Sequence, residues 1–119
     1  MPVKTHRQLI AWQKAMQLAK STYIATQKMP AEERFGLTMQ MRRAAVSIPS
    51  NIAEGFGRQS RPDLLKFLRT ARGSLNELTT QMEITQELRM LTKASDWTEL
   101  AAEADRVLQA LIRSLERKR

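Results

Sequence analysis

Apolar side chains recur at steps of three and four residues along most of this chain, and that spacing limits its fold more than any other feature. Such steps place side chains on one face of an α-helix. Four apolar stripes are separated by short segments rich in residues that interrupt helices. The stripes predict helices at about residues 6–29, 36–54, 61–91 and 96–117, all within one domain that spans residues 1–119.

The stripe residues are expected to face a common core. In the first two helices they are Leu9, Trp12, Met16, Ala19, Tyr23, Leu37, Met41, Ala44 or Ala45, Ile48 and Ile52. In the last two they are Leu64, Leu68, Ala71, Leu75, Leu78, Met82, Trp97, Leu100, Ala104, Leu108, Leu111 and Leu115. Short connections between helices force neighbours to run antiparallel. The sequence therefore predicts an all-α fold, an antiparallel up-down-up-down four-helix bundle.

The chain is strongly basic, with 20 lysines and arginines against 12 aspartates and glutamates and a formal net charge of +8. Most of the excess lies before residue 73, whereas residues 73–119 are nearly balanced. This pattern favours a polyanionic partner, although a merely solvated basic face remains the alternative. We expect phosphate contacts from a cluster near the junction of the second and third helices: Arg42, Arg43, Arg58, Arg61, Lys66, Arg69 and Arg72.

The segment SIPSNIAEGFGRQS, residues 47–60, interrupts the helical pattern. Pro49 cannot donate a hydrogen bond to the carbonyl of Ala45, so we expect a kink in the second helix. Gly55 is a candidate for the left-handed position just beyond the helix end. Ser60 is expected to cap the third helix, with Asp63 completing a capping box.

Local backbone physics leaves Asn51, Glu54 and Arg58 unexplained. In a catalytic interpretation, Glu54 would be a general base oriented by Asn51. In a structural interpretation, these side chains bond to backbone or to a neighbouring subunit. The glycines beside Glu54 argue against a regular helical ion pair with Arg58. We favour the structural interpretation, because the chain lacks other catalytic parts.

Other enzyme classes find little support. The only histidine is His6, there is no cysteine, and the Glu-x-x-His pairs of di-iron bundles are missing. The sequence also contains no phosphate-binding loop of the GxxxxGK[ST] type. We therefore expect no catalytic residue, no metal site and no cofactor. No apolar run is long enough to cross a membrane and no signal peptide is evident, so we expect a cytoplasmic protein without a membrane partner.

The runs MRRAAVSIPSNIAEGFGRQS and FLRTARGSLNELTTQMEIT resemble the bacterial four-helix-bundle family named after 23S rRNA intervening sequences. The structural signature of this resemblance comprises Ser47, Pro49, Asn51, Glu54, Gly55, Gly73 and Ser74. The resemblance implies a bundle assembled as a ring-shaped homopentamer. It also implies relatives that accompany diversity-generating retroelements and bind a reverse transcriptase and nucleic acid.

The small pair Gly73 and Ser74 lies inside the third helix, where glycine costs about 1 kcal/mol. Such a cost usually has a packing reason. We expect close approach of the Pro49 region or of another subunit, so that Gly73→Leu would disturb folding or assembly.

Together these observations predict a non-enzymatic homo-oligomer that binds RNA or a nucleoprotein complex through a basic surface. The first alternative is a protein–protein adaptor that docks an acidic partner such as a reverse transcriptase. The second is an enzyme centred on Asn51, Glu54 and Arg58.

Overall fold

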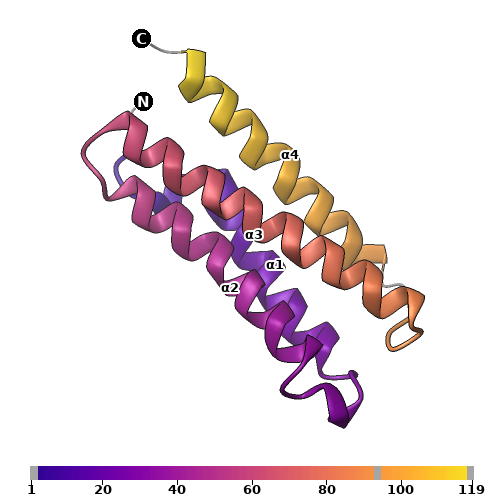
Figure 1. Ribbon diagram of the computed structural model, residues 1–119. Coiled ribbons are helices and arrows are strands. Elements are labelled where there is room, and N and C mark those ends of the chain that lie inside the picture. Colours follow the sequence, from indigo (N-terminus) through magenta and orange to yellow (C-terminus); the bar gives the residue numbers. More distant parts are fainter. Residues whose placement is uncertain (1–2, 93–94, 118–119) are drawn as a thin grey trace.

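The computed structural model describes residues 3–92 and 95–117, and within them it contains helices and no strand (Figure 1). The predicted all-α fold with four helices is therefore confirmed. The α-helices are α1 (Ile10–Thr26), α2 (Leu37–Phe56), α3 (Arg61–Glu87) and α4 (Ser95–Arg117). Two short 3-10 helices, η1 (His6–Gln8) and η2 (Ala31–Glu33), precede α1 and α2.

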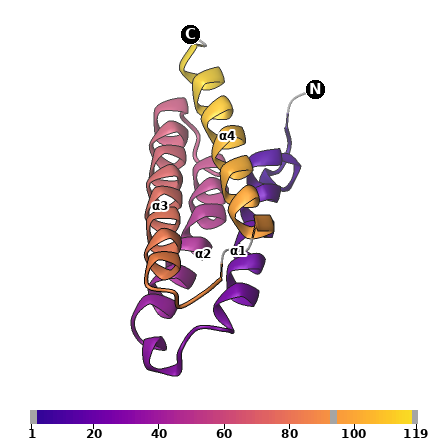
Figure 2. The same ribbon diagram turned by 90° about the vertical axis from the view of Figure 1, so that its right-hand side faces the viewer.

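The helices lie along a rod of 48 × 24 × 19 Å. Around this rod, α1 contacts α2 and α4, and α3 contacts the same two helices. The α1–α2 turn, the end of α3 and the start of α4 lie at one end (Figures 1 and 2). The α2–α3 turn, η1 and the end of α4 lie at the other end.

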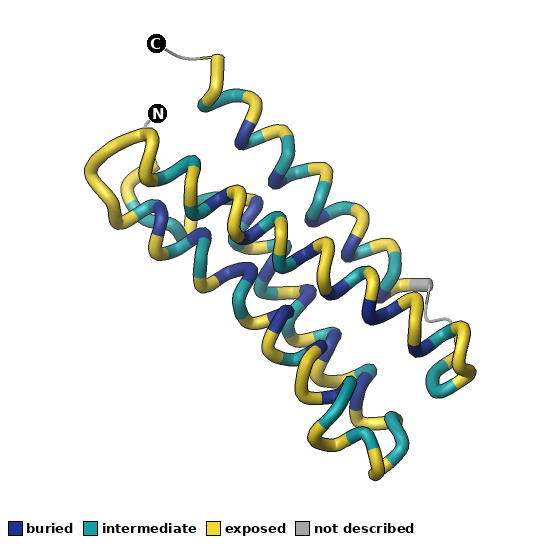
Figure 3. Tube along the Cα trace, in the orientation of Figure 1, coloured by how far each residue is buried: buried dark blue, intermediate teal, exposed yellow. Residues whose placement is uncertain are grey.

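Buried side chains follow the inner faces of the helices, and exposed residues occupy the outer faces and turns (Figure 3). The stripe predicted for α3 is confirmed from Leu68 to Met82, with Leu64 partly buried. The stripe of α2 is confirmed from Met41 to Ile52, and both Ala44 and Ala45 are buried. The core of α4 comprises Trp97, Ala101, Ala104, Leu108 and Ile112.

The predicted core face of α1 is wrong by part of a turn. The buried residues of this helix are Ala11, Ala15, Leu18, Thr22 and Thr26. Tyr23, which the stripe placed in the core, is 44% exposed. The apolar pattern misses the true face because two of its members are threonines.

Those threonines can be buried because their hydroxyl groups find partners. The Thr22 hydroxyl donates to the Leu18 carbonyl at 2.7 Å and accepts from the Trp97 indole N–H at 3.0 Å. The Thr26 hydroxyl donates to the Thr22 carbonyl at 2.7 Å. These hydrogen bonds form a buried polar network that links α1 to α4.

The largest differences from the predicted helix bounds lie at the start of the first helix and at the end of the third. Leu9 has an extended backbone between η1 and α1, so the predicted first helix is divided. The longest helix, α3, ends at Glu87 because Arg89 adopts a left-handed conformation with φ of 59°. The Met90 N–H then bonds to the Thr85 carbonyl at 2.8 Å, which closes a Schellman-type cap.

Helix α2 continues through Pro49, which is buried. In the turn before the proline, the Ser50 hydroxyl donates to the Val46 carbonyl and the Asn51 amide donates to the Ser47 carbonyl, both at 2.8 Å. These short polar side chains support the backbone where proline removes a donor.

The prediction that Gly55 takes a left-handed conformation beyond the helix is wrong. No described glycine has a positive φ, and Gly55 lies buried within the last turn of α2. A Cβ atom at this position would lie 2.7 Å from the Phe67 Cβ and 3.3 Å from the Leu64 carbonyl oxygen. Glycine is thus required because α2 and α3 approach each other closely. The Ser60 cap is confirmed, since its hydroxyl accepts from the Asp63 N–H at 3.2 Å.

Gly73 behaves differently from the prediction. It is exposed, and an added Cβ would meet nothing within 4 Å among the atoms described. Close approach of the Pro49 region is therefore wrong as the reason for this glycine. Its neighbour Ser74 does contact α2, with its hydroxyl 2.8 Å from that of Ser47.

The two helical glycines provide a matched test of packing. We expect Gly55→Ala to lower the free energy of unfolding by about 1–3 kcal/mol, because overpacking displaces side chains or backbone. Gly73→Ala should raise it by about 0.5–1 kcal/mol, because alanine is the better helix former where space is open. Urea unfolding followed by circular dichroism measures both. A Gly55→Ala protein as stable as wild type would contradict the close contact.

Candidate nucleic-acid interface

The α2–α3 turn and the end of α4 lie at the same end of the rod (Figures 1 and 2), and Arg69 of α3 contacts Glu116 of α4 there. Basic residues from distant parts of the sequence belong to these segments. We call this group the basic end, and it comprises Arg58, Arg61, Lys66, Arg69, Arg113 and Arg117. All these residues are exposed. Fewer acidic residues lie there, so the end carries a local excess of positive charge.

Two arginines of the basic end are paired with carboxylates. The Arg58 guanidinium lies 2.9 Å from Glu54 and also covers the Phe67 ring at 4.8 Å. Arg69 lies 2.6 Å from Glu116 of α4. The paired side chains are 44–55% exposed, so these ion pairs contribute little and can open for a competing anion.

The expectation that Glu54 and Arg58 would not pair is wrong. It assumed that the glycines end the helix at residue 54, whereas α2 extends to Phe56. The longer helix holds Glu54 one turn before Arg58. Within residues 3–92 and 95–117, Arg61 and Lys66 find no partner for an ion pair or a side-chain hydrogen bond, so they are available to an anion.

A polar groove between α3 and α4 adjoins the basic end. It has a volume of about 380 Å³, and its walls include Arg69, Arg72, Asn76, Gln109 and Arg113. The exposed backbone of Gly73 leaves one side of the groove open. Guanidinium and amide groups in a groove of this kind can donate hydrogen bonds to phosphate and ribose oxygens.

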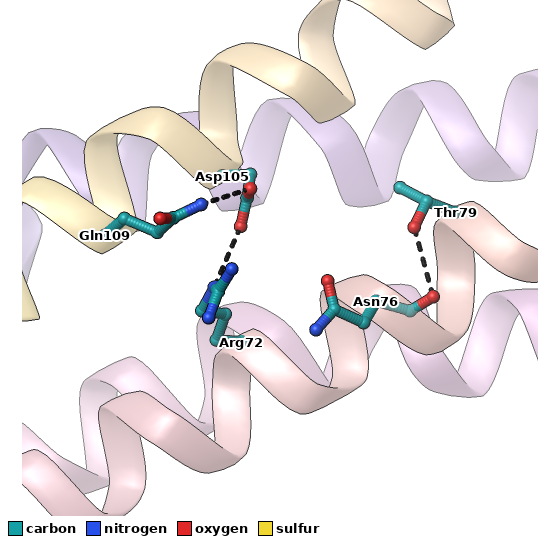
Figure 4. Close-up of polar contacts among 5 residues, drawn as sticks. All are labelled: Arg72, Asn76, Thr79, Asp105 and Gln109. Carbon is teal, nitrogen blue, oxygen red and sulfur yellow. Dashed lines mark hydrogen bonds and ion pairs between the residues drawn. The ribbon is translucent and has the colours of Figure 1, made fainter.

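Carboxylate contacts hold the middle of this groove (Figure 4). Arg72 reaches across from α3, and its Nε lies 3.4 Å from Asp105 Oδ1. The Gln109 amide donates to the other oxygen of Asp105 at 2.6 Å. Asp105 therefore orients Arg72 toward α4 while the arginine stays half exposed.

The seven predicted cations do not form one cluster. Arg42 lies between α1 and α2, where its Nε donates to the Thr26 hydroxyl at 2.8 Å and its guanidinium covers the Tyr23 ring at 4.7 Å. Arg43 is exposed and unpaired, but it precedes Arg58 by fifteen positions, or roughly 20 Å along a helix. Arg42 thus serves the fold, and Arg43 belongs to another surface.

The signature residues of the Pro49 region bond to one another. The Asn51 amide donates to the Ser47 hydroxyl at 2.9 Å, and that hydroxyl meets Ser74 of α3. Asn51 therefore holds the Ser47 hydroxyl that contacts α3, and Glu54 has Arg58 as its partner. The arrangement that a Glu54 base oriented by Asn51 requires is not formed.

In the part of the chain that the structure describes, no group of three or more histidines, aspartates and glutamates could hold a metal ion. Within the same part of the chain, no helix is both long and apolar enough to cross a membrane.

The prediction missed the contribution of α4. Arg113 and Arg117 join the basic end, and Asp105 and Glu116 supply carboxylates to the α3 arginines. A signal was available in the sequence, because the predicted up-down-up-down bundle would place the end of the fourth helix beside the start of the third. Counting charge along the sequence hides this contact.

These features define a small all-α protein of four helices with a basic end and an adjoining polar groove. Residues 7–113 match the family model described as 23S rRNA-intervening sequence protein, so the chain belongs to that family. The resemblance seen in the sequence is thereby confirmed. A search of curated proteins found no match.

The different roles of Arg42 and Arg61 can be tested. We expect Arg42→Ala to lower the free energy of unfolding by about 1–3 kcal/mol, because it removes a hydrogen bond to Thr26 and the stacking on Tyr23. Arg61→Ala should change it by less than about 0.5 kcal/mol, because that side chain is exposed and unpaired. Thermal or urea unfolding measures the two values. Equal effects would contradict a structural role for Arg42.

Proposed function

We propose that this protein is a non-enzymatic homo-oligomer that binds RNA, alone or within a nucleoprotein complex, through its basic end and the α3–α4 groove. The observation that carries the proposal is the gathering of cations from the α2–α3 turn, α3 and α4 on one end of the rod. Because these side chains are exposed, they can replace the counterions of a phosphate backbone.

The chemistry of the surface favours recognition of the backbone and its shape. Arginine forks match phosphate oxygens, and the amides of Asn76 and Gln109 in the groove can bond to sugar hydroxyl groups. Aromatic residues make up only 5% of the chain, which leaves few rings for stacking of unpaired bases. A structured RNA is therefore a better ligand than an extended single strand.

The proposal takes the bundle as the antiparallel up-down-up-down unit expected from the sequence, which the alternating positions of the turns in Figure 1 support. The homopentameric ring implied by the family resemblance would bring several basic ends together. Weak phosphate contacts would then act at once and raise the overall affinity.

A second candidate is an adaptor that docks an acidic protein such as a reverse transcriptase. The observation in its favour is the same basic end, whose unpaired Arg61 and Lys66 would suit a carboxylate-rich surface equally well. The two candidates differ in partner class, so binding measurements separate them.

The RNA proposal predicts a defined salt dependence. We expect the double change Arg61→Ala and Lys66→Ala to weaken binding to an RNA hairpin. It should also reduce the slope of log K against log salt concentration by about 1 for each phosphate contact removed. Fluorescence anisotropy with a labelled hairpin, measured at several sodium chloride concentrations, gives both quantities.

Lys28→Ala is the matched control, because Lys28 is exposed beside the α1–α2 turn at the opposite end of the rod. It should leave affinity and slope close to wild type. If wild-type protein ignores RNA but forms a tight complex with one acidic protein, the adaptor replaces the RNA proposal. Equal losses in the control and the double variant would remove the basic end as the site.

A further inference from the structure

Two exposed surfaces of this chain combine apolar side chains with charged ones, and the charged residues are basic on one surface and acidic on the other. We propose that they bind each other between copies, so that the apolar groove on α2 of one copy holds the end of α3 of the next. The inference rests on the homo-oligomer in the proposed function and names its interface.

The first surface, which we call the arginine-rimmed groove, lies along the outer side of α2. Its floor and walls include Tyr23, Phe35, Met39 and Val46, which are 39–77% exposed, and its volume is about 630 Å³. Arg34 and Arg43 line it as well. Phe35 is the most exposed at 77%, and its ring, with the Arg34 guanidinium 5.5 Å from the centroid, still leaves most of its apolar area in water, which is unfavourable.

The second surface, which we call the acidic patch, lies on the outer side of the last turns of α3. Ile84 and Leu88 are 40% and 60% exposed and four residues apart, so they project from the same face of the helix. Glu83 and Glu87 flank them and are exposed, with no ion pair among the described residues. Apolar anchors at this spacing are those with which a helix enters a groove.

The two surfaces match in charge as well as in apolar character. Arg34 and Arg43 rim one, and Glu83 and Glu87 rim the other. The apolar residues of both surfaces are exposed in the folded chain, so they do not cover each other within a single molecule. Docking between copies would bury Ile84 and Leu88 against Phe35 and Met39 and bring opposite charges together at the rim.

Their position along the rod decides the type of assembly. Gln81 of α3 bonds to Gln40 of α2 at 3.4 Å, which places the start of α2 level with the end of α3. Contact between two different surfaces at one level requires rotation between copies with little shift along the rod. Such heterologous contacts close into a ring where the rotation between neighbouring copies divides a full turn evenly. The basic ends of all copies would then lie on the same side of the ring.

RNA is a less suitable occupant of the arginine-rimmed groove. One of its arginines, Arg42, is held by Thr26 and Tyr23, and the exposed side chains Met39 and Val46 offer no hydrogen bond to phosphate. The acidic patch would in addition repel RNA at this end of the rod.

Charge exchange tests the interface without RNA. We expect light scattering of the wild-type chain to give a multiple of the 13.7 kDa subunit mass. Arg43→Glu alone, and Glu83→Arg with Glu87→Arg, should each weaken association by about a hundredfold or more, because like charges then face each other. Combining all three changes in one chain should restore a large part of the mass.

Arg106→Glu is the matched control, because it reverses an exposed, unpaired charge on α4 and should leave the mass unchanged. Circular dichroism confirms that each variant is folded, and Phe35→Ser provides an uncharged test of the groove. A monomeric wild type, or reversal variants that keep full mass, would overturn the interface. Loss of hairpin binding by Arg43→Glu with unchanged mass would also overturn it, by assigning the groove to RNA.

These outcomes are distinct from failure of the RNA proposal. Assembly is measured with no RNA present, whereas the basic end is tested by Arg61→Ala with Lys66→Ala. A ring that falls apart on charge reversal but never binds RNA would support the interface alone.

Discussion

The close contact between α2 and α3 determines where each surface of this protein lies. It depends on Gly55, where the backbone of α2 comes so near Phe67 that a side chain would collide. The Ser47–Ser74 contact fixes the same pair of helices in the middle, and Gln40 and Gln81 meet further along. Because the contact begins at the α2–α3 turn, Arg58, Arg61 and Lys66 are presented at that end of the rod. Because it extends to Gln81, the arginine-rimmed groove and the acidic patch end at the same level.

Most of this arrangement could be predicted from the sequence where apolar periodicity and local backbone rules agree. The α3 stripe and the Ser60 cap belong to that class, since each depends on residues a few positions apart. The core face of α1 could not be predicted in the same way. Thr22 and Thr26 are polar by type, and they become suitable for burial only because Trp97, Arg42 and their own helix satisfy the hydroxyl groups. The left-handed conformation predicted for Gly55 was wrong because local backbone rules do not describe its role. This glycine allows close contact with Phe67, twelve positions away in the sequence.

The sequence predicted the basic character of the candidate interface but did not identify all of its residues. Net charge and the run from Arg58 to Arg72 indicated a polyanion surface, and all five basic residues of that run lie at or beside the basic end. Arg42 could not be separated from them by sequence, since its partners come from α1. Arg113 and Arg117 could be added only once the end of α4 was known to lie beside the start of α3.

The arginines of this chain differ in the free energy needed to break the contacts that each makes in the folded protein. Arg42 has a buried hydroxyl partner and an aromatic ring beneath it, so its removal leaves polar and apolar atoms without contacts. Arg69 pairs with the exposed Glu116, and Arg72 pairs with the partly buried Asp105. Both arginines are themselves 43–54% exposed, so water can replace these contacts at little cost. A phosphate backbone can therefore compete for them, while Asp105 and Glu116 keep both side chains extended toward the groove before it arrives. On this view the acidic residues of α4 do not oppose anion binding. They orient the α3 arginines in the free protein, and a phosphate group can displace them from those arginines. Because only these surface contacts change, binding leaves the fold unchanged.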